Sequence, residues 1–263
     1  NGSYNSSNNV LTVTGDGLPS PVNSGTFPNA NNSNTITSYA FNHNFVYRGG
    51  SNTSDSGVVG LGAIGIAANG VVFFNPSAGT DGSPPSGFSY VAAGIGSAVN
   101  YGEDSCGGYP ESSGQYRYND SDFIDCWNAN QVMAGYNDYY GSSQYNGDNI
   151  RHPDGHSKII GYSFDGYPVY GPYGYTDAND NTTPVIRMSS GWTVRTQEAP
   201  GRPSYDTTYP AGVFMEDYEY TGGTGKLDTH NGRHCVTPEY PSGTFAYFLT
   251  EDSSGNPVFP FMM

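Results

Sequence analysis

Glycine and proline occur along almost the whole chain, and this feature most constrains the fold that it can adopt. The 263 residues include 37 Gly and 18 Pro. Both residue types disfavour helix interiors, whereas Tyr, Thr and Val favour the pleated surface of a strand, and the chain has 23 Tyr. We therefore expect an all-β protein: a single β-sandwich-like domain with long ordered loops and at most one or two short helices.

Six segments carry the alternating or continuous apolar pattern of β-strands. They are Val10–Thr14, Ile36–Tyr47, Val58–Phe74, Lys158–Tyr173, Val213–Tyr220 and Gly243–Thr250. Asn69-Gly70 and Asp165-Gly166 each lie inside such a segment, and dipeptides of this type favour the two-residue turn of a β-hairpin. One short helix is expected near Trp127–Tyr139. We find no internal repeat and no linker, which predicts one domain over residues 15–263.

Residues 1–14 are expected to stand apart from this domain. The polar run from Asn1 to Asn9 predicts a mobile leader. It precedes a short strand whose apolar positions are Val10, Leu11 and Val13. Such a strand can add to the sheet edge of a neighbouring copy, so we expect a head-to-tail contact that builds a filament. The alternative is that the strand pairs within its own domain.

The charge of the chain is strongly acidic, with 24 Asp and Glu against 9 Lys and Arg, a formal net charge of −15. Nucleic-acid binding depends on clustered cations, and the few basic residues form no cluster. No window approaches the roughly 20 apolar residues of a membrane helix. We therefore expect no nucleic acid as partner and no membrane span. The acidic surface suits a salty extracellular setting or cation binding, or solubility alone.

Cysteines and glycosylation motifs predict an oxidising, extracellular location. Cys106 and Cys126 bracket a loop rich in Gly, Ser and Tyr, and we expect them to form a disulfide. Cys235 is left over as a buried thiol, an intermolecular bridge or the true partner of one of the other two. Six Asn-x-Ser/Thr motifs lie in polar, turn-like stretches. The candidate glycosylation sites are Asn1, Asn5, Asn31, Asn52, Asn119 and Asn181.

Histidines and acidic residues supply candidate metal ligands in loops. His152-Pro-Asp154-Gly-His156 and Asp228-Thr-His230 each combine imidazole and carboxylate groups. Proline and glycine within the first string exclude the helix that a zinc-protease motif requires. The alternative is that these histidines are hydrogen-bonded loop residues.

Two further loops are rich in the oxygen ligands that calcium prefers. They are Asp120–Asp125 and Asp177–Asn181. Neither has the spacing of an EF-hand, and solvated turns are the alternative. We expect no cofactor, with calcium as the one cation to consider.

No catalytic motif is apparent in the chain. It has no G-x-S-x-G string, no Walker motif and no cysteine in a recognisable nucleophile context. Glu216 and Asp217 could act as a glycosidase pair only at a carboxylate separation that the sequence does not define. We therefore expect that the protein is not an enzyme.

Several longer strings resemble the YHYH-domain family, in order and over nearly the whole chain. They are Asp104–Tyr118, His156–Pro172 and Leu227–Arg233, with Gly17–Pro19, Phe27–Asn29 and Ala68–Pro76 upstream and Val236–Tyr247 downstream. The closest pattern is that of structural proteins of marine bacteriophages, and family members are extracellular or virion-associated. The resemblance therefore implies surface display and assembly more than chemistry.

The motif that names this family is not retained. Tyr-His-Tyr-His would fall at 116–119 and at 245–248, where this chain has Tyr-Arg-Tyr-Asn and Phe-Ala-Tyr-Phe. Any histidine ligand set of the relatives is therefore lost, and we expect no tightly bound transition metal. Matching residues that could form a reduced site remain. These are His156, Asp165, Asp228 and His230.

These observations predict a non-enzymatic extracellular structural protein, either a subunit or a displayed module of a surface filament or virion appendage. Tyr-rich loops would supply contact area at modest entropic cost. The expected partner is the protein itself, as a homo-oligomer or filament. The alternative is a carbohydrate- or metal-binding adhesin module that contacts cell-surface glycans, and a secreted metal-dependent enzyme is a third class.

Overall fold

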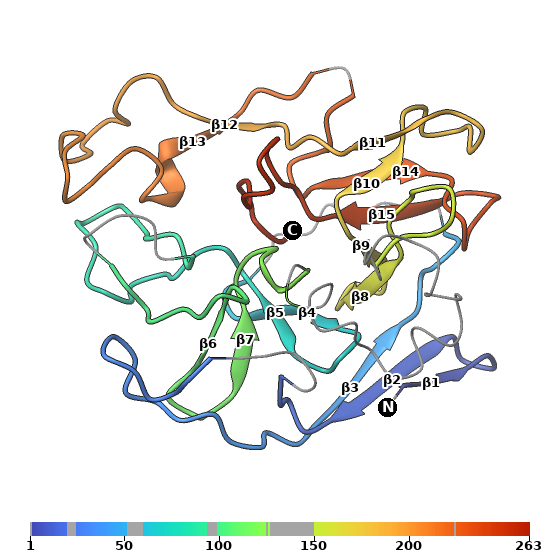
Figure 1. Ribbon diagram of the computed structural model, residues 1–263, viewed down its shortest axis with the longest axis horizontal. Coiled ribbons are helices and arrows are strands. Elements are labelled where there is room, and N and C mark those ends of the chain that lie inside the picture. Colours follow the sequence, from blue (N-terminus) through green and yellow to red (C-terminus); the bar gives the residue numbers. More distant parts are fainter. Residues whose placement is uncertain are drawn as a thin grey trace.

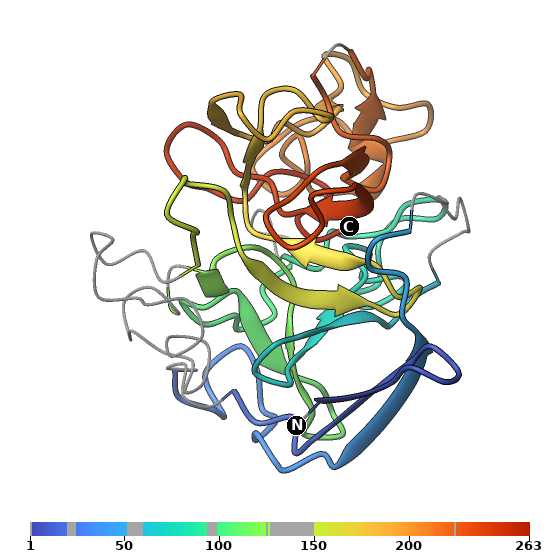
Figure 2. The ribbon, with the colours of Figure 1, turned by 90° about the vertical axis from the view of Figure 1, so that its right-hand side faces the viewer.

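The computed structural model describes residues 2–19, 25–51, 60–93, 99–124, 126, 150–223 and 225–263. The described chain is nearly all β-structure. A three-stranded sheet near the N-terminus lies at one end of the molecule, below an eight-stranded central sheet (Figure 1). Much of the segment 173–220 lies at the opposite end (Figure 2). No helix in the described ranges is long and apolar enough to cross a membrane.

The three-stranded sheet consists of β1 (Gly2–Asn5), β2 (Val10–Gly15) and β3 (Phe41–Val46), in that order. β2 pairs antiparallel with both of its neighbours. Residues Gly2–Asn5 of the polar N-terminal run, which was expected to be a mobile leader, thus form a strand of the chain's own sheet. Val10, Leu11 and Val13, expected to pair with another copy, pair within the chain, as in the alternative.

The central sheet follows the order β14-β15-β9-β8-β4-β5-β7-β6. Its strands are β4 (Ala63–Ala67), β5 (Val72–Phe74), β6 (Gly108–Pro110), β7 (Tyr116–Tyr118), β8 (Ile159–Ser163), β9 (Pro168–Tyr170), β14 (Gly232–Cys235) and β15 (Thr244–Phe248). The hairpins predicted at Asn69-Gly70 and Asp165-Gly166 are β4–β5 and β8–β9. Gly70 and Gly166 have φ angles of 92° and 96° in these turns, which a residue with a Cβ adopts only with strain.

The central sheet contains two similar units, related by a pseudo-two-fold axis between β4 and β8. The first unit is β4, β5, β7 and β6, and the second is β8, β9, β15 and β14, on either side of the axis (Figure 1). In each unit a third strand pairs in parallel with the second strand of the hairpin and antiparallel with a fourth strand. The expectation that the chain holds no internal repeat is therefore wrong.

Equivalent residues of the two hairpins make equivalent contacts. Both hairpins have the same register and the same irregularity after their first paired residue. A Cβ at Gly65 would lie 2.7 Å from the Tyr162 carbonyl oxygen, and a Cβ at Gly161 would lie 2.3 Å from the Ile66 carbonyl oxygen. Both positions therefore require glycine for β4 and β8 to approach each other across the axis.

The loops that lead into β6 and β14 match as well. The Asp104 amide donates to the Gly108 carbonyl at 2.9 Å, and the Asp228 amide donates to the Gly232 carbonyl at 2.9 Å. Through Oδ1, each aspartate accepts the amide of the residue two positions on. This correspondence places three pairs of residues at equivalent positions. The pairs are Glu103 and Leu227, Asn119 and Phe248, and Asp120 and Leu249.

The remaining described strands form two short pairs. β10 (Tyr173–Tyr175) pairs with β11 (Val185–Arg187), and β12 (Trp192–Val194) pairs with β13 (Tyr218–Tyr220). A 3-10 helix at Met215–Asp217 interrupts what was predicted as one strand. The predicted helix near Trp127–Tyr139 lies outside the described residues.

Sheet-on-sheet packing supports the predicted sandwich-like architecture. Phe41 and Phe45 of β3 pack with Ile66 of β4, and Tyr162 of β8 joins this cluster. The three-stranded sheet therefore covers part of one face of the central sheet. The all-β class predicted from the sequence is confirmed.

Candidate functional site

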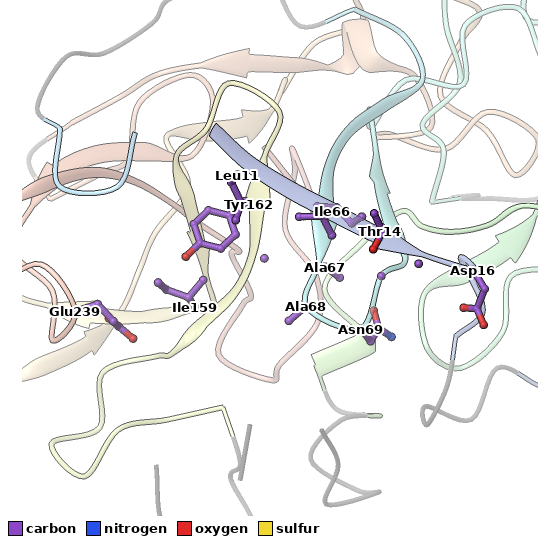
Figure 3. Close-up of a pocket in the computed structure, with 14 residues that line it drawn as sticks. Leu11, Thr14, Asp16, Ile66, Ala67, Ala68, Asn69, Ile159, Tyr162 and Glu239 are labelled. Atoms are coloured by element: carbon purple, nitrogen blue, oxygen red, sulfur yellow. The ribbon is translucent and has the colours of Figure 1, made fainter. Parts of the chain in front are cut away.

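A groove of about 670 Å³ lies between β2 and the central strands β4 and β8 (Figure 3). Ile66, Ala67 and Ile159 supply apolar side chains to its lining, and Leu11 and Val13 of β2 contribute as well. Leu11 and Val13, two of the three residues expected to mediate contact between copies, therefore line a groove of their own chain. The groove lies beside the pseudo-two-fold axis, because β4 and β8 flank that axis.

Polar side chains lie at both ends of this groove. Asp16 and Asn69 lie at one end, and Glu239 lies at the other, with the Tyr162 ring between Glu239 and the centre (Figure 3). The Asn69 amide is held in place because its Nδ2 donates to the Tyr118 hydroxyl at 2.9 Å. The groove thus combines an apolar middle and an aromatic ring with hydrogen-bonding groups at its ends.

Three tyrosine hydroxyls meet at the Glu239 end of the groove. The Tyr47 and Tyr240 hydroxyls are hydrogen-bonded to each other, and the Tyr162 hydroxyl joins them. Burial raises the pKa of Tyr162, and the nearby Tyr47 raises it further. The Tyr162 hydroxyl is therefore neutral at pH 7 and can both donate and accept a hydrogen bond.

Buried partners hold the Glu239 carboxylate in a fixed position. Its Oε1 lies 2.8 Å from Nε2 of His152, and its Oε2 accepts a hydrogen bond from the Tyr170 hydroxyl at 3.0 Å. Both His152 and Tyr170 are buried. An acceptor that is fixed before a ligand arrives loses little conformational entropy on binding.

His152, Asp154 and His156 share one tight loop, but they have different partners. Asp154 accepts hydrogen bonds from the Tyr175 hydroxyl and the His156 amide. His156 is fully buried, with Nδ1 2.7 Å from the Ser157 carbonyl oxygen and no partner at Nε2. Burial lowers the pKa of His156 to about 4, so its ring is neutral at pH 7.

Asp165 and Asp228 support loops and tyrosines in the second unit. Asp165 accepts a hydrogen bond from the Tyr247 hydroxyl at 2.6 Å, and Asp228 accepts those of the His230 and Gly232 amides. Among the described residues, no three or more His, Cys, Asp or Glu side chains are placed to hold a metal ion. The predicted ligands are therefore not brought together as a metal site. They are His152, Asp154, His156, Asp165, Asp228 and His230.

The predicted disulfide between Cys106 and Cys126 is confirmed, with a Cα–Cα distance of 5.6 Å. Cys235 is a buried free thiol, which is one of the alternatives left open by the sequence. Burial raises the pKa of this thiol, which therefore stays protonated and unreactive at pH 7.

The candidate glycosylation sites differ in exposure. Asn5, Asn31 and Asn181 are exposed and have room for a glycan. Asn119 is fully buried and its Nδ2 donates to Glu103, so the folded chain has no room for a glycan there. Asn1 and Asn52 lie outside the described residues.

Sequence reasoning missed the polar residues of the groove. It assigned Asn69 to a turn and Tyr162 to a strand, and it gave no role to Asp16 or Glu239. The internal repeat was a usable signal, because Ile-Gly and Asn/Asp-Gly recur at matching spacing in Ile64–Gly70 and Ile160–Gly166. Aligning the two hairpins would have revealed the duplication of the central sheet.

The fold and the groove define an all-β protein with a duplicated central sheet and a ligand-sized groove between stacked sheets. The chain belongs to the YHYH protein family, whose model matches residues 42–258. This match covers both units of the central sheet, whereas β1 and β2 precede it. No curated protein and no solved structure matches the chain significantly.

Proposed function

We propose that the protein is a non-enzymatic extracellular binding module whose groove takes a short carbohydrate segment. The geometry of the groove carries this proposal. Sugar rings present apolar C–H faces and a perimeter of hydroxyl groups. The Tyr162 ring and the apolar middle of the groove suit those faces, while Asp16, Asn69 and Glu239 suit the hydroxyls.

The size of the groove agrees with such a ligand. Its volume of about 670 Å³ lies within the range of roughly 300–1,000 Å³ that is typical of small-molecule sites. Hydroxyl groups of the ligand would donate to the fixed Glu239 carboxylate, and charged acceptors form stronger hydrogen bonds than neutral ones. The carbohydrate alternative of the sequence analysis therefore becomes the leading hypothesis.

The groove lining favours binding without turnover. Among its described residues there is no histidine, cysteine, serine or lysine. The two carboxylates, Asp16 and Glu239, lie at opposite ends of the groove (Figure 3). Thr14 supplies the only aliphatic hydroxyl of the described lining, and no histidine or lysine of that lining is present to activate it as a nucleophile.

Two observations support an extracellular location. The Cys106–Cys126 disulfide suits an oxidising compartment. Three glycosylation motifs have exposed asparagines, as attachment of a glycan in the secretory route requires.

A glycan array followed by calorimetric titration tests the carbohydrate proposal. We expect Tyr162→Ala to weaken binding of the best oligosaccharide at least tenfold, because it removes the stacking ring. Asp16→Asn should weaken binding by a smaller factor. Tyr39→Ala serves as the matched control, since Tyr39 is an exposed tyrosine outside the groove lining. Equal affinity of the wild type and Tyr162→Ala would contradict the proposal.

Assembly through β1 is a second candidate function, favoured by the position of this strand. β1 is the outer strand of the three-stranded sheet, and its residues Ser3 to Asn5 are exposed, with Tyr4 52% exposed. No described strand covers its outer edge. An open edge presents unpaired amide and carbonyl groups to which a second copy can add its own β1.

Sedimentation velocity of the wild type and of Tyr4→Lys tests this assembly. A charge on the edge strand disfavours strand pairing between copies. We expect oligomers of the wild type to shift towards monomer in Tyr4→Lys, while Tyr39→Lys sediments as the wild type does. A wild type that stays monomeric at high concentration would rule out assembly through β1.

A further inference from the structure

A buried polar cluster occurs in the first unit of the central sheet. Asn119 is fully buried and Asp120 is 5% exposed. Asn119 Nδ2 donates to Oε1 of the partly buried Glu103 at 3.2 Å, while Asn119 Oδ1 has no hydrogen-bond partner. The Asn119 amide therefore faces Glu103 through its nitrogen, while its oxygen is a buried acceptor that has no partner among the described residues.

The second unit shows that the fold does not need polar residues at these positions. Leu227, Phe248 and Leu249 are their counterparts, with exposures of 1%, 0% and 0%. The amides of Asn119 and Phe248 donate to matching loop carbonyls at 2.8 and 2.9 Å, which fixes the correspondence. Leu227 and Phe248 pack in one apolar cluster of the second unit and Leu249 packs in another, so the fold accepts apolar side chains at all three positions and does not itself require the buried acidic groups of the first unit.

The carboxylates of the cluster lie close together without a described counter-charge. Asn119, which donates to Glu103, directly precedes Asp120 in the chain. Burial raises the pKa of Glu103, and the negative charge of Asp120 raises it further. Neither Glu103 nor Asp120 pairs with a lysine, arginine or histidine among the described residues. Asp104 and Asp122 add negative charge nearby. Neighbouring buried carboxylates without a cation destabilise the folded state.

The backbone leaves room for the Asp120 carboxylate at this site. A Cβ at Gly107 would lie only 1.9 Å from Asp120 Oδ1. Because Gly107 has no Cβ, it leaves the space that the Asp120 carboxylate fills. In the second unit the corresponding loop position is Asn231, opposite the apolar Leu249.

We propose that a calcium ion binds in this cluster, coordinated by the carboxylates of Glu103 and Asp120 and by Oδ1 of Asn119. All of these ligands are oxygens, which calcium prefers over nitrogen and sulfur. Calcium accepts six to eight oxygens, so water and main-chain carbonyl groups complete its coordination. The Asn119 amide oxygen takes the place of a third acidic ligand, so this calcium site uses only two carboxylate side chains.

Calorimetric titration of the chelator-treated, full-length protein with calcium chloride tests this site. We expect one ion per chain with a dissociation constant on the order of 10⁻⁴ M, as in extracellular modules. Asp120→Asn should weaken binding at least tenfold. Asp180→Asn is the matched control, because Asp180 lies in the other oxygen-rich loop and is exposed. It should bind calcium as the wild type does.

A double variant separates ligand loss from misfolding. Glu103→Leu with Asp120→Leu introduces leucines at both positions, as in the second unit. We expect this variant to fold, to melt at or above the temperature of the calcium-free wild type, and to show no rise in melting temperature with calcium. The proposal is overturned if the wild type shows no calcium-dependent heat, if both Asp120 variants keep wild-type affinity, or if Asp180→Asn abolishes binding.

Discussion

Ile66 and Tyr162 pair directly across the boundary between β4 and β8, and each is the counterpart of the other in its own unit. The pseudo-two-fold axis therefore passes between an aliphatic and an aromatic side chain. Both residues line the groove. Because Tyr162 is aromatic and its counterpart Ile66 is aliphatic, the groove has an aromatic ring only towards its Glu239 end, and its other end is open around Asn69 (Figure 3).

The repeat provides a matched pair of hydrogen bonds whose energies should differ. The Tyr118 hydroxyl accepts from Asn69 at 2.9 Å, whereas the Tyr247 hydroxyl donates to the Asp165 carboxylate at 2.6 Å. Bonds to a charged group contribute more than neutral ones, so Tyr247→Phe should cost about 2 kcal/mol and Tyr118→Phe about 1 kcal/mol. Urea unfolding at pH 7 measures both, and a larger loss for Tyr118→Phe would contradict the assignment.

The buried ion pair of Arg202 and Asp217 should be a main support of the segment between β12 and β13. Both side chains are fully buried, and Asp217 also accepts the amides of Gly212 and Phe214. Asp217→Ala leaves a buried guanidinium unpaired and should lower the free energy of unfolding by roughly 3–5 kcal/mol.

An exposed ion pair on the neighbouring strand serves as the control for Asp217. Arg195 and Glu219 lie 3.0 Å apart with side chains that are 39% and 41% exposed. Glu219→Ala should cost less than about 1 kcal/mol because water screens this pair. Similar losses for the two variants in urea unfolding would show that burial does not set the difference.

Stability should fall in mild acid because of His156. Burial lowers the pKa of His156 to about 4 in the folded chain, and an unfolded histidine titrates near 6.5. Below that value the unfolded chain binds a proton that the folded chain does not. The contribution of neutral His156 is therefore complete above pH 6.5 and is lost as the pH falls towards 4, by roughly 3 kcal/mol.

His156→Phe isolates this contribution, because Phe fits among the rings of Tyr170, Tyr175 and Phe248 and does not titrate. Unfolding free energies of both proteins between pH 7 and pH 4 should diverge, with the wild type losing more. Parallel curves would mean that His156 takes up its proton in the folded chain as readily as in the unfolded one.

The hairpins could be predicted from the sequence, whereas β6 and β7 could not. Asn69-Gly70 and Asp165-Gly166 predict turns between apolar segments, and this prediction depends only on residues that are adjacent in the sequence. β7 contains the buried Arg117, whose guanidinium stacks on Phe74 and Tyr109 and pairs with Glu111 at 2.8 Å. Because tertiary packing supplies these partners, the Tyr-Arg-Tyr string alone does not predict a buried strand.

The polar residues of the groove could not be predicted from the sequence either, because tertiary packing sets their positions as well. Hydrogen bonds from His152 and Tyr170, which lie far from Glu239 along the chain, hold its carboxylate in position. Asp16 faces the groove only because β2 packs over the central sheet. The candidate metal ligands show the converse. His152, Asp154 and His156 are close together in the sequence, and Asp165 matches a position of the family, but the carboxylates of Asp154 and Asp165 accept hydrogen bonds from the Tyr175 and Tyr247 hydroxyls.

Nuclear magnetic resonance of the isotope-labelled protein, titrated with the best oligosaccharide from the glycan array, locates the bound sugar on the protein residue by residue. If the sugar binds in the groove, amide shifts change at Ala67, Ala68, Gly70 and Gly161, which line it, and Tyr162→Ala removes these changes. Shift changes confined to exposed loops such as 177–183, with the groove amides unaffected, would contradict binding in the groove.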